Sequence, residues 1–261
     1  MQLQANNINI EYSLTGRLGA PTVVLSHSLA CNHFMWNPQL EILEKDYQVL
    51  AYDTRGHGNS EVTTGPYTLD QLADDVIAMA NELKIDQFHW VGLSMGGMIG
   101  QSLGLRYPER LIKLVLCDTL SKQPQEAYPI WAARIDTALQ HGVAPLAQPT
   151  MERWFTANYR ENNPDAVNFI NKQFLATKPE GYTACCQAIM GLNYLDQLSA
   201  IELPTLVMVG DSDNATPVSA AQDIHRNIKG SQLEIIPAAA HLSNMEQPDI
   251  FNALLTSFLK K

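Results

Sequence analysis

The stretch Gly92-Leu93-Ser94-Met95-Gly96-Gly97 joins an apolar run at residues 88–91 to a helical pattern at residues 98–107. In a strand-to-helix elbow the central serine adopts a strained backbone conformation, and the residues two places before and after it must be small. Gly92 and Gly96 meet that requirement. The pattern therefore predicts a nucleophilic Ser94, and the alternative is a glycine-rich turn with an idle serine.

Apolar runs alternate with helical patterns along most of the chain. We expect paired strands at 3–10 and 10–14, then strands at 22–26, 47–52, 88–91, 111–117, 206–209 and 233–236. Helical patterns cover 69–83, 98–107, 218–227 and 250–259. Strands that alternate with helices predict an α/β fold with a mostly parallel, doubly wound sheet of eight strands flanked by helices.

This alternation stops between about residues 120 and 199, where helical patterns follow one another at 126–141, 144–156, 165–176 and 182–191. Such a segment cannot extend the sheet. Ligands of open α/β sheets bind at the carboxyl edge, so the segment is expected to form a cap there. The predicted organisation is a core of residues 1–120 and 199–261 with an inserted helical cap of residues 121–198.

A serine nucleophile needs a base, and in this architecture the base comes last in the chain order Ser, Asp, His. His241 follows the last predicted strand and precedes the final helix, whose first residue Pro248 marks. His27 and His57 lie in loops near the same edge but precede Ser94. The other histidines are interpreted as surface or packing residues: His33, His89, His141 and His225.

The acid that holds the base is expected in the loop after the strand at 206–209. Asp213 is the preferred candidate, and Asp211 is interpreted as a loop-capping residue. Asp118, after the preceding strand, is the rival acid. Replacing Asp213 by Asn should lower turnover without abolishing binding.

An oxyanion requires two backbone N–H donors. The first is predicted from Met95, directly after the nucleophile, and the second from Leu29 in the loop after the strand at 22–26. The alternative for the segment around Ser28 is a plain turn. The charged, glycine-rich loop at 53–60 is given a structural role at the edge below the pocket.

Composition excludes several classes of protein. A length of 261 residues suits a single sizeable core, and a net charge of -10 without a Lys/Arg cluster argues against nucleic-acid partners. Neither a secretory signal nor an apolar segment long enough for a bilayer is apparent, so a cytoplasmic protein without membrane partners is expected.

The cysteines have no C-x-x-C spacing and predict reduced, mostly buried thiols: Cys31, Cys117, Cys185 and Cys186. The oligomeric state stays open.

The motifs resemble those of the α/β-hydrolase superfamily, which shares the elbow, the D-x-R-G-x-G-x-S loop at 53–60 and the G-x-x-D-x-x-T-P motif at 210–217. More narrowly, the chain resembles the 3-oxoadipate enol-lactonases. The matching stretches are 28–29, 35–39, 67–75, 92–100, Trp131 with Arg134, 153–156 and 185–189. It departs from that family at 27–30, which read His-Ser-Leu-Ala instead of Asn-Ser-Leu-Gly, and at 193–195, where an acidic and basic pair is replaced by Asn-Tyr-Leu.

The resemblance implies hydrolysis of an enol-lactone to 3-oxoadipate, a step of aromatic catabolism, by a triad that needs neither cofactor nor metal. The small-molecule substrate carries a carboxylate, and Arg134 is the candidate cation for it. The alternative for Arg134 is a surface ion pair with a neighbouring carboxylate. Ser28, Trp131 and Trp154 are candidate pocket residues, although aromatic residues of a cap often serve packing alone.

Two other functions use the same scaffold. One is a broad carboxylesterase or a hydrolase of carbon-carbon bonds in ring-cleavage products, with the same triad under a different cap. The other is a ligand receptor that has lost turnover, whose usual sign is a damaged triad.

Overall fold

The computed structural model describes residues 1–260, which fold around an eight-stranded sheet. The strand order is β1-β2-β4-β3-β5-β6-β7-β8, and every neighbouring pair from β4 to β8 is parallel. The predicted α/β class and mostly parallel sheet are confirmed. The strands are β1 Gln2–Ala5, β2 Ile8–Gly16, β3 Thr22–Ser26, β4 Gln48–Tyr52, β5 Phe88–Leu93, β6 Leu111–Cys117, β7 Thr205–Gly210 and β8 Gln232–Ile236.

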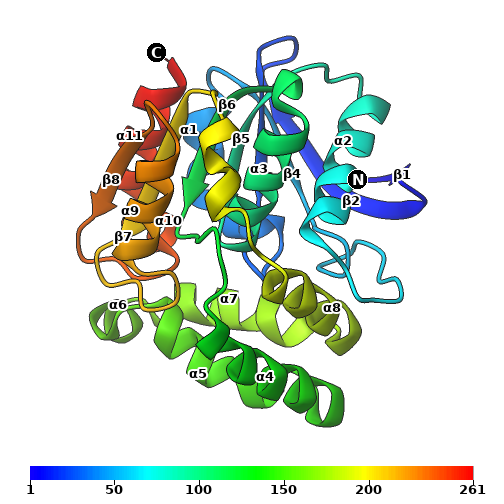
Figure 1. Ribbon diagram of the computed structural model, residues 1–261, viewed down its shortest axis with the longest axis vertical. Coiled ribbons are helices and arrows are strands. Elements are labelled where there is room, and N and C mark those ends of the chain that lie inside the picture. Colours follow the sequence, from blue (N-terminus) through cyan, green and yellow to red (C-terminus); the bar gives the residue numbers. More distant parts are fainter. Residues whose placement is uncertain (261) are drawn as a thin grey trace.

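Helices cover both faces of this sheet, with α2, α3 and α9 on one side and α1 and α11 on the other (Figure 1). The core helices are α1 Asn37–Leu43, α2 Leu69–Glu82, α3 Met95–Arg106, α9 Val218–Asn227, α10 Ser243–Glu246 and α11 Pro248–Lys260. Short 3-10 helices are η1 His33–Trp36, η2 Pro108–Arg110, η3 Gln125–Ala127 and η4 Leu195–Ala200. None of the helices in residues 1–260 combines the length and apolar character that a bilayer crossing requires.

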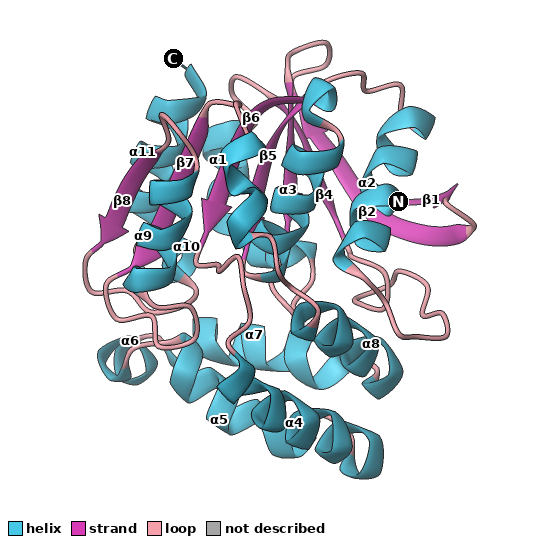
Figure 2. Ribbon diagram, in the orientation of Figure 1, coloured by secondary structure: helices cyan, strands magenta, loops and turns pink. Residues whose placement is uncertain are grey.

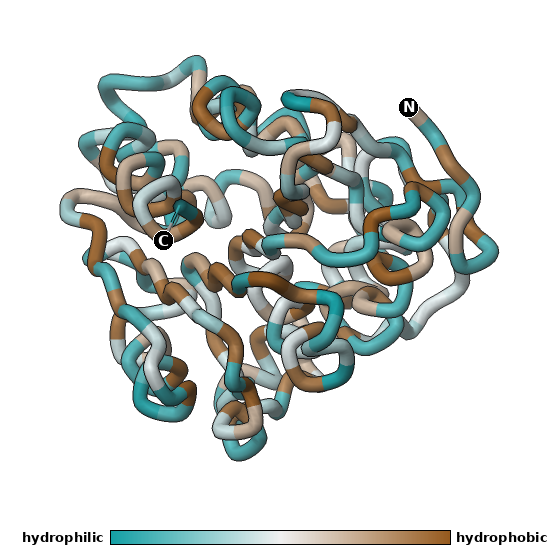
Figure 3. Tube along the Cα trace, turned by 90° about the horizontal axis from the view of Figure 1, so that it is seen from above, coloured by the Kyte–Doolittle hydropathy of each residue, from teal (hydrophilic) through white to brown (hydrophobic). Residues whose placement is uncertain are grey.

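The central strands are apolar throughout because both of their faces are covered. Every residue of β3 and of β5 is buried. Figure 3 shows hydrophilic stretches at the outside of the trace, in loops and on outer turns of helices. The amphipathic helix α2 begins at a Thr68 cap, whose hydroxyl accepts a hydrogen bond from the Gln71 N–H at 3.0 Å.

The insertion between β6 and β7 consists of helices that lie beyond the carboxyl ends of the strands (Figures 1 and 2). Its helices are α4 Tyr128–His141, α5 Ala144–Trp154, α6 Ala157–Asn162, α7 Pro164–Ala176 and α8 Pro179–Met190. We call this segment the cap. Its division from the core at residues 121 and 198 stays a prediction.

The structure differs from the predicted elements at several boundaries. The first hairpin turns at Asn6 and Asn7 rather than at Ile10, because both asparagines adopt positive φ angles of 47° and 61°, a conformation that asparagine tolerates well. Helix α3 starts at Met95, three residues earlier than expected, because the glycines after Ser94 weaken the helical pattern without preventing the helix. The sequence does not predict the short helices α1, α6 and α10.

Candidate active site

Ser94 stands at a sharp turn between β5 and α3. Its backbone angles are φ 56° and ψ −113°, a strained combination for a residue with a side chain. A Cβ atom on Gly92 would overlap the carbonyl group of Gly96, and one on Gly96 would overlap the carbonyl group of Ser26. Only glycine fits at these two places, so the predicted elbow and the observed turn have the same steric cause.

Asp213 and His241 come from the loops after β7 and β8 and form a buried pair. Asp213 Oδ2 lies 2.9 Å from His241 Nδ1, and the two side chains are 0% and 3% exposed. Since a carboxylate only accepts hydrogen bonds, the imidazole proton is assigned to Nδ1, which leaves Nε2 as the basic nitrogen.

Further donors surround the Asp213 carboxylate. The backbone N–H groups of Ala215 and Thr216 donate to Oδ1 at 2.7 and 2.9 Å, and the Thr216 hydroxyl donates to Oδ2 at 2.6 Å. Burial by itself would raise the pKa of Asp213, but the charge of His241 and these hydrogen bonds together lower it below its usual value. The acid therefore stays ionised at neutral pH.

Ser94 and His241 line one cavity of about 560 Å³ between the sheet edge and the cap. Within residues 1–260 no hydrogen bond joins the Ser94 hydroxyl to His241. Catalytic hydrogen bonds are often long in the absence of substrate, and they shorten when substrate binds. The structure therefore brings the predicted serine, base and acid to one site. Of the two hydrogen bonds that would join the three, the one between the Ser94 hydroxyl and His241 is not formed.

The other carboxylates in these loops have different partners. Asp118 accepts hydrogen bonds from the Gly210 N–H at 2.9 Å and the Ser243 hydroxyl at 2.6 Å. Burial, and then the charge of Asp213, raise the pKa of Asp118 well above its usual value. Asp211 accepts from the Ala238 N–H at 3.0 Å, as its loop-capping interpretation expects. Among the residues described, no hydrogen bond or ion pair joins either of them to His241.

The two predicted oxyanion donors are unpaired. Within the described part of the chain, the N–H groups of Leu29 and Met95 donate to no protein acceptor. Met95 is the first residue of α3, and Leu29 lines the cavity. Buried N–H groups without partners are rare, so these two are available for a ligand oxygen.

Buried histidines hold the loop that carries Leu29. His57 Nε2 accepts a hydrogen bond from the Ala30 N–H at 2.8 Å, and His27 Nε2 accepts one from the Thr54 N–H at 2.9 Å. Burial lowers the pKa of both, that of His57 to about 3. Both rings are therefore neutral at physiological pH and act as fixed acceptors.

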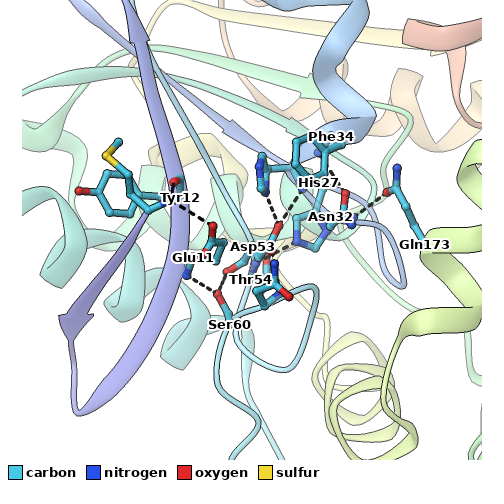
Figure 4. Close-up of polar contacts among 12 residues, drawn as sticks. Glu11, Tyr12, His27, Asn32, Phe34, Asp53, Thr54, Ser60 and Gln173 are labelled. Carbon is cyan, nitrogen blue, oxygen red and sulfur yellow. Dashed lines mark hydrogen bonds and ion pairs between the residues drawn. The ribbon is translucent and has the colours of Figure 1, made fainter.

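Figure 4 shows how the loop at 53–60 supports the same segment from below. Asp53 Oδ1 accepts hydrogen bonds from the backbone and the ring of His33, the latter at 2.6 Å, and Oδ2 accepts from the Asn59 N–H at 2.9 Å. From the cap helix α7, Gln173 Oε1 accepts from the Asn32 N–H at 2.9 Å. Of the two interpretations of His33, packing or surface, the structure therefore supports packing, since it is a buried partner of Asp53.

The predicted pocket residues all line the cavity: Ser28, Trp131, Arg134 and Trp154. The Trp154 ring lies 5.9 Å from the His241 ring, and the Ser28 hydroxyl is buried without a partner. Arg134 donates to the Tyr182 hydroxyl and forms no ion pair among residues 1–260, unlike the surface alternative considered for it.

Arg153 also lines the cavity, although the sequence alone predicts no role for it. The sequence points to Arg153 only through the resemblance of residues 153–156 to the enol-lactonases. Helical spacing does not indicate which way its side chain points, because neighbours in a helix face different directions.

Comparisons with known proteins bear on the family and the fold. Residues 21–248 match the family described as alpha/beta hydrolase fold. The chain is 36% identical over 259 residues to 3-oxoadipate enol-lactonase 2 of Acinetobacter baylyi, covering 99% of this chain and 96% of that protein. The enol-lactonase structure from Burkholderia xenovorans superposes with a TM-score of 0.97 at 35% identity over 100% of both chains. A thermophilic esterase from Thermogutta terrifontis, with malate bound, superposes with a TM-score of 0.94 at 29% identity, covering 100% of this chain and 97% of that one.

Proposed function

This chain belongs to the α/β-hydrolase fold family, and we propose that it is a serine hydrolase that opens the enol-lactone of 3-oxoadipate to give 3-oxoadipate. The observation that carries the proposal is the buried Asp213–His241 pair, which shares a capped cavity with Ser94 at a strained elbow. The names of the Acinetobacter and Burkholderia relatives support the substrate. The reaction belongs to the catabolism of aromatic compounds.

In the first step, the Ser94 hydroxyl attacks the lactone carbonyl while His241 Nε2 takes its proton. The N–H groups of Leu29 and Met95 bind the oxyanion that forms. The bond from the carbonyl carbon to the ring oxygen then breaks. The departing oxygen is an enolate, which needs less protonation than an alkoxide would. It takes the proton from the His241 imidazolium, so that Nε2 is neutral again, and the released enol tautomerises to a ketone.

In the second step, water attacks the acyl-enzyme as His241 Nε2 removes its proton. The ester bond to Ser94 breaks, and the imidazolium returns a proton to the serine oxygen. Asp213 holds the imidazole in the required tautomer and stabilises the imidazolium in both steps. The product has two carboxylates.

A broad esterase is the second candidate, because the Thermogutta relative is an esterase of the same fold. That relative binds malate, a small dicarboxylate, which supports an anionic ligand for the related cavity here. The intact Asp213–His241 pair argues against a receptor without turnover.

The test compares kcat/KM of the purified protein for 3-oxoadipate enol-lactone and for 4-nitrophenyl acetate. We expect a clear preference for the lactone, and we expect Ser94→Ala to lose about 10⁵-fold or more in kcat. Similar low efficiency on both substrates would favour the esterase. Absence of turnover on any acyl substrate would favour the receptor and contradict the proposal.

A further inference from the structure

Arg153 is a cation in the cavity, and no group in the described part of the chain neutralises it. It lies in the last turn of α5 and lines the cavity together with Ser94 and His241. Its Nε atom is buried without a hydrogen-bond partner, and within residues 1–260 no carboxylate pairs with its guanidinium. A half-buried guanidinium without a counter-ion is costly, and an anionic ligand would offset that cost.

Arg134, the cation expected from the sequence, is already engaged. Its Nε and Nη2 donate to the Tyr182 hydroxyl at 3.0 and 2.7 Å, and Nη2 also donates to the Thr150 hydroxyl at 3.2 Å. Its guanidinium carbon also lies 5.5 Å from the centre of the Trp131 ring. The Nε/Nη2 edge, which could grip a carboxylate at two points, is therefore occupied.

The position of Arg153 suits a small acyl group. Trp154, its neighbour in the chain, lies with its ring 5.9 Å from the His241 ring. Burial, and then repulsion from Arg134, lower the pKa of Arg153 to about 10, while the charge of Asp213 opposes this shift. The guanidinium is therefore charged at neutral pH and lies within electrostatic range of the catalytic acid.

We propose that Arg153, and not Arg134, binds the free carboxylate of the substrate, so that the site selects short acyl groups that end in a carboxylate. This inference rests on the proposed function, in which the acyl-enzyme is a six-carbon chain with a terminal carboxylate. Arg134 supports the wall by holding Tyr182, Thr150 and Trp131 in place. Arg153 is then the specificity-determining residue of the cavity.

The experiment measures kcat/KM for two esters of equal acyl length. One is the mono-4-nitrophenyl ester of adipic acid, and the other is 4-nitrophenyl hexanoate, which lacks the second carboxylate. We expect the wild type to prefer the anionic ester. Arg153→Met should reduce that preference about 10- to 100-fold, mainly through KM, because a charge-assisted, two-point contact is lost. Turnover of the neutral ester reports that the variant is folded.

Arg160→Met is the matched control, since Arg160 is a cap arginine whose Nε also lacks a partner but which lines a separate groove between α5, α6 and α7. It should keep the wild-type preference. Arg153→Lys keeps the charge without the planar fork and should give an intermediate preference. If Arg153→Met does not fold, Arg153→Lys is compared with the wild type in its place.

Three results would overturn the inference: no charge preference in the wild type, a preference that survives in Arg153→Met, or one that disappears in Arg134→Met alone. A wild-type measurement is independent of all variants, because adipate should inhibit hexanoate ester turnover more strongly than uncharged adipamide. Equal inhibition would also overturn it. Failure of the proposed function looks different, since the lactone itself would then not be hydrolysed.

Discussion

The predicted role of His241 as a base depends on Asp213, whose carboxylate accepts a hydrogen bond from the imidazole. Asp213 accepts hydrogen bonds from the imidazole Nδ1, from two backbone N–H groups and from the Thr216 hydroxyl. These contacts fix the carboxylate in place and leave it ionised. The nearby Asp118, whose pKa is raised by burial, binds Ser243 and Gly210 instead. The pKa values of two carboxyl groups at one sheet edge are therefore shifted in opposite directions.

This difference predicts how two isosteric substitutions behave. In Asp213→Asn the amide favours the wrong imidazole tautomer, and kcat for the lactone should fall about 10³- to 10⁴-fold with little change in KM. Asp118→Asn changes a carboxyl whose hydrogen-bond partners within residues 1–260 are Gly210 and Ser243 and not His241, so kcat should stay within about tenfold of wild type. Steady-state kinetics of both variants provide the test, and equal losses would contradict the assignment of Asp213.

Among the elements, the end of α5 and the start of α6 are tied to the loop that carries His241. Glu246 in α10 accepts hydrogen bonds from the Thr156 hydroxyl at 2.7 Å and from the Ala240 N–H at 2.9 Å. The Leu242 N–H donates to the Trp154 carbonyl at 3.2 Å. The cap and the loop that carries His241 are thus joined at one corner, and a buried carboxylate is the link between them.

Replacing that link tests its contribution. Glu246→Gln keeps the size of the side chain but turns an N–H toward one of its donors, so we expect a loss of about 1–3 kcal/mol in the free energy of unfolding. The lactone kcat should also fall, since His241 loses support. Denaturant unfolding and kinetics measure the two effects. Glu152→Gln, at an exposed position of α5, is the control and should change neither the free energy of unfolding nor kcat. If Glu246→Gln also leaves both quantities at their wild-type values, the role of this link is refuted.

For the whole molecule, buried neutral histidines determine how stability depends on pH. Burial lowers the pKa of His57 to about 3 and that of His89 to about 4, from 6.5 for an exposed histidine. Between pH 6.5 and these lowered pKa values, His57 and His89 bind protons in the unfolded chain but stay neutral in the folded chain. These residues therefore make the protein less stable as pH falls. Asp118 acts in the opposite direction, because its raised pKa lets the folded state bind a proton first.

The variant His57→Gln isolates one of these contributions, because glutamine can accept the hydrogen bond from Ala30 but does not titrate. Its free energy of unfolding should fall less steeply with acid than that of wild type, by about 1.4 kcal/mol per pH unit between pH 6 and pH 4. Urea unfolding at several pH values measures both slopes. Parallel slopes would show that His57 does not carry the effect.

Local patterns were enough for the sheet, the elbow and the family. Alternating apolar runs and helices predict the α/β class because hydrophobic periodicity acts over a few residues, and the glycines at 92 and 96 are required by sterics within one turn. The confirmed fold then places the loops with Ser94, Asp213 and His241 at one edge, since parallel strands end together. Their catalytic roles stay a prediction.

Contacts between distant segments were decided only by tertiary packing. Thr156 meets Glu246 across 90 residues. The neighbours Arg153 and Trp154 both reach the cavity that Ser94 lines, although nothing in helical spacing indicates it. The same packing engages Arg134 with Tyr182 and leaves Arg153 unpaired. Which cation stays free depends on side-chain partners supplied by other helices, and such partners are absent from any local stretch of sequence.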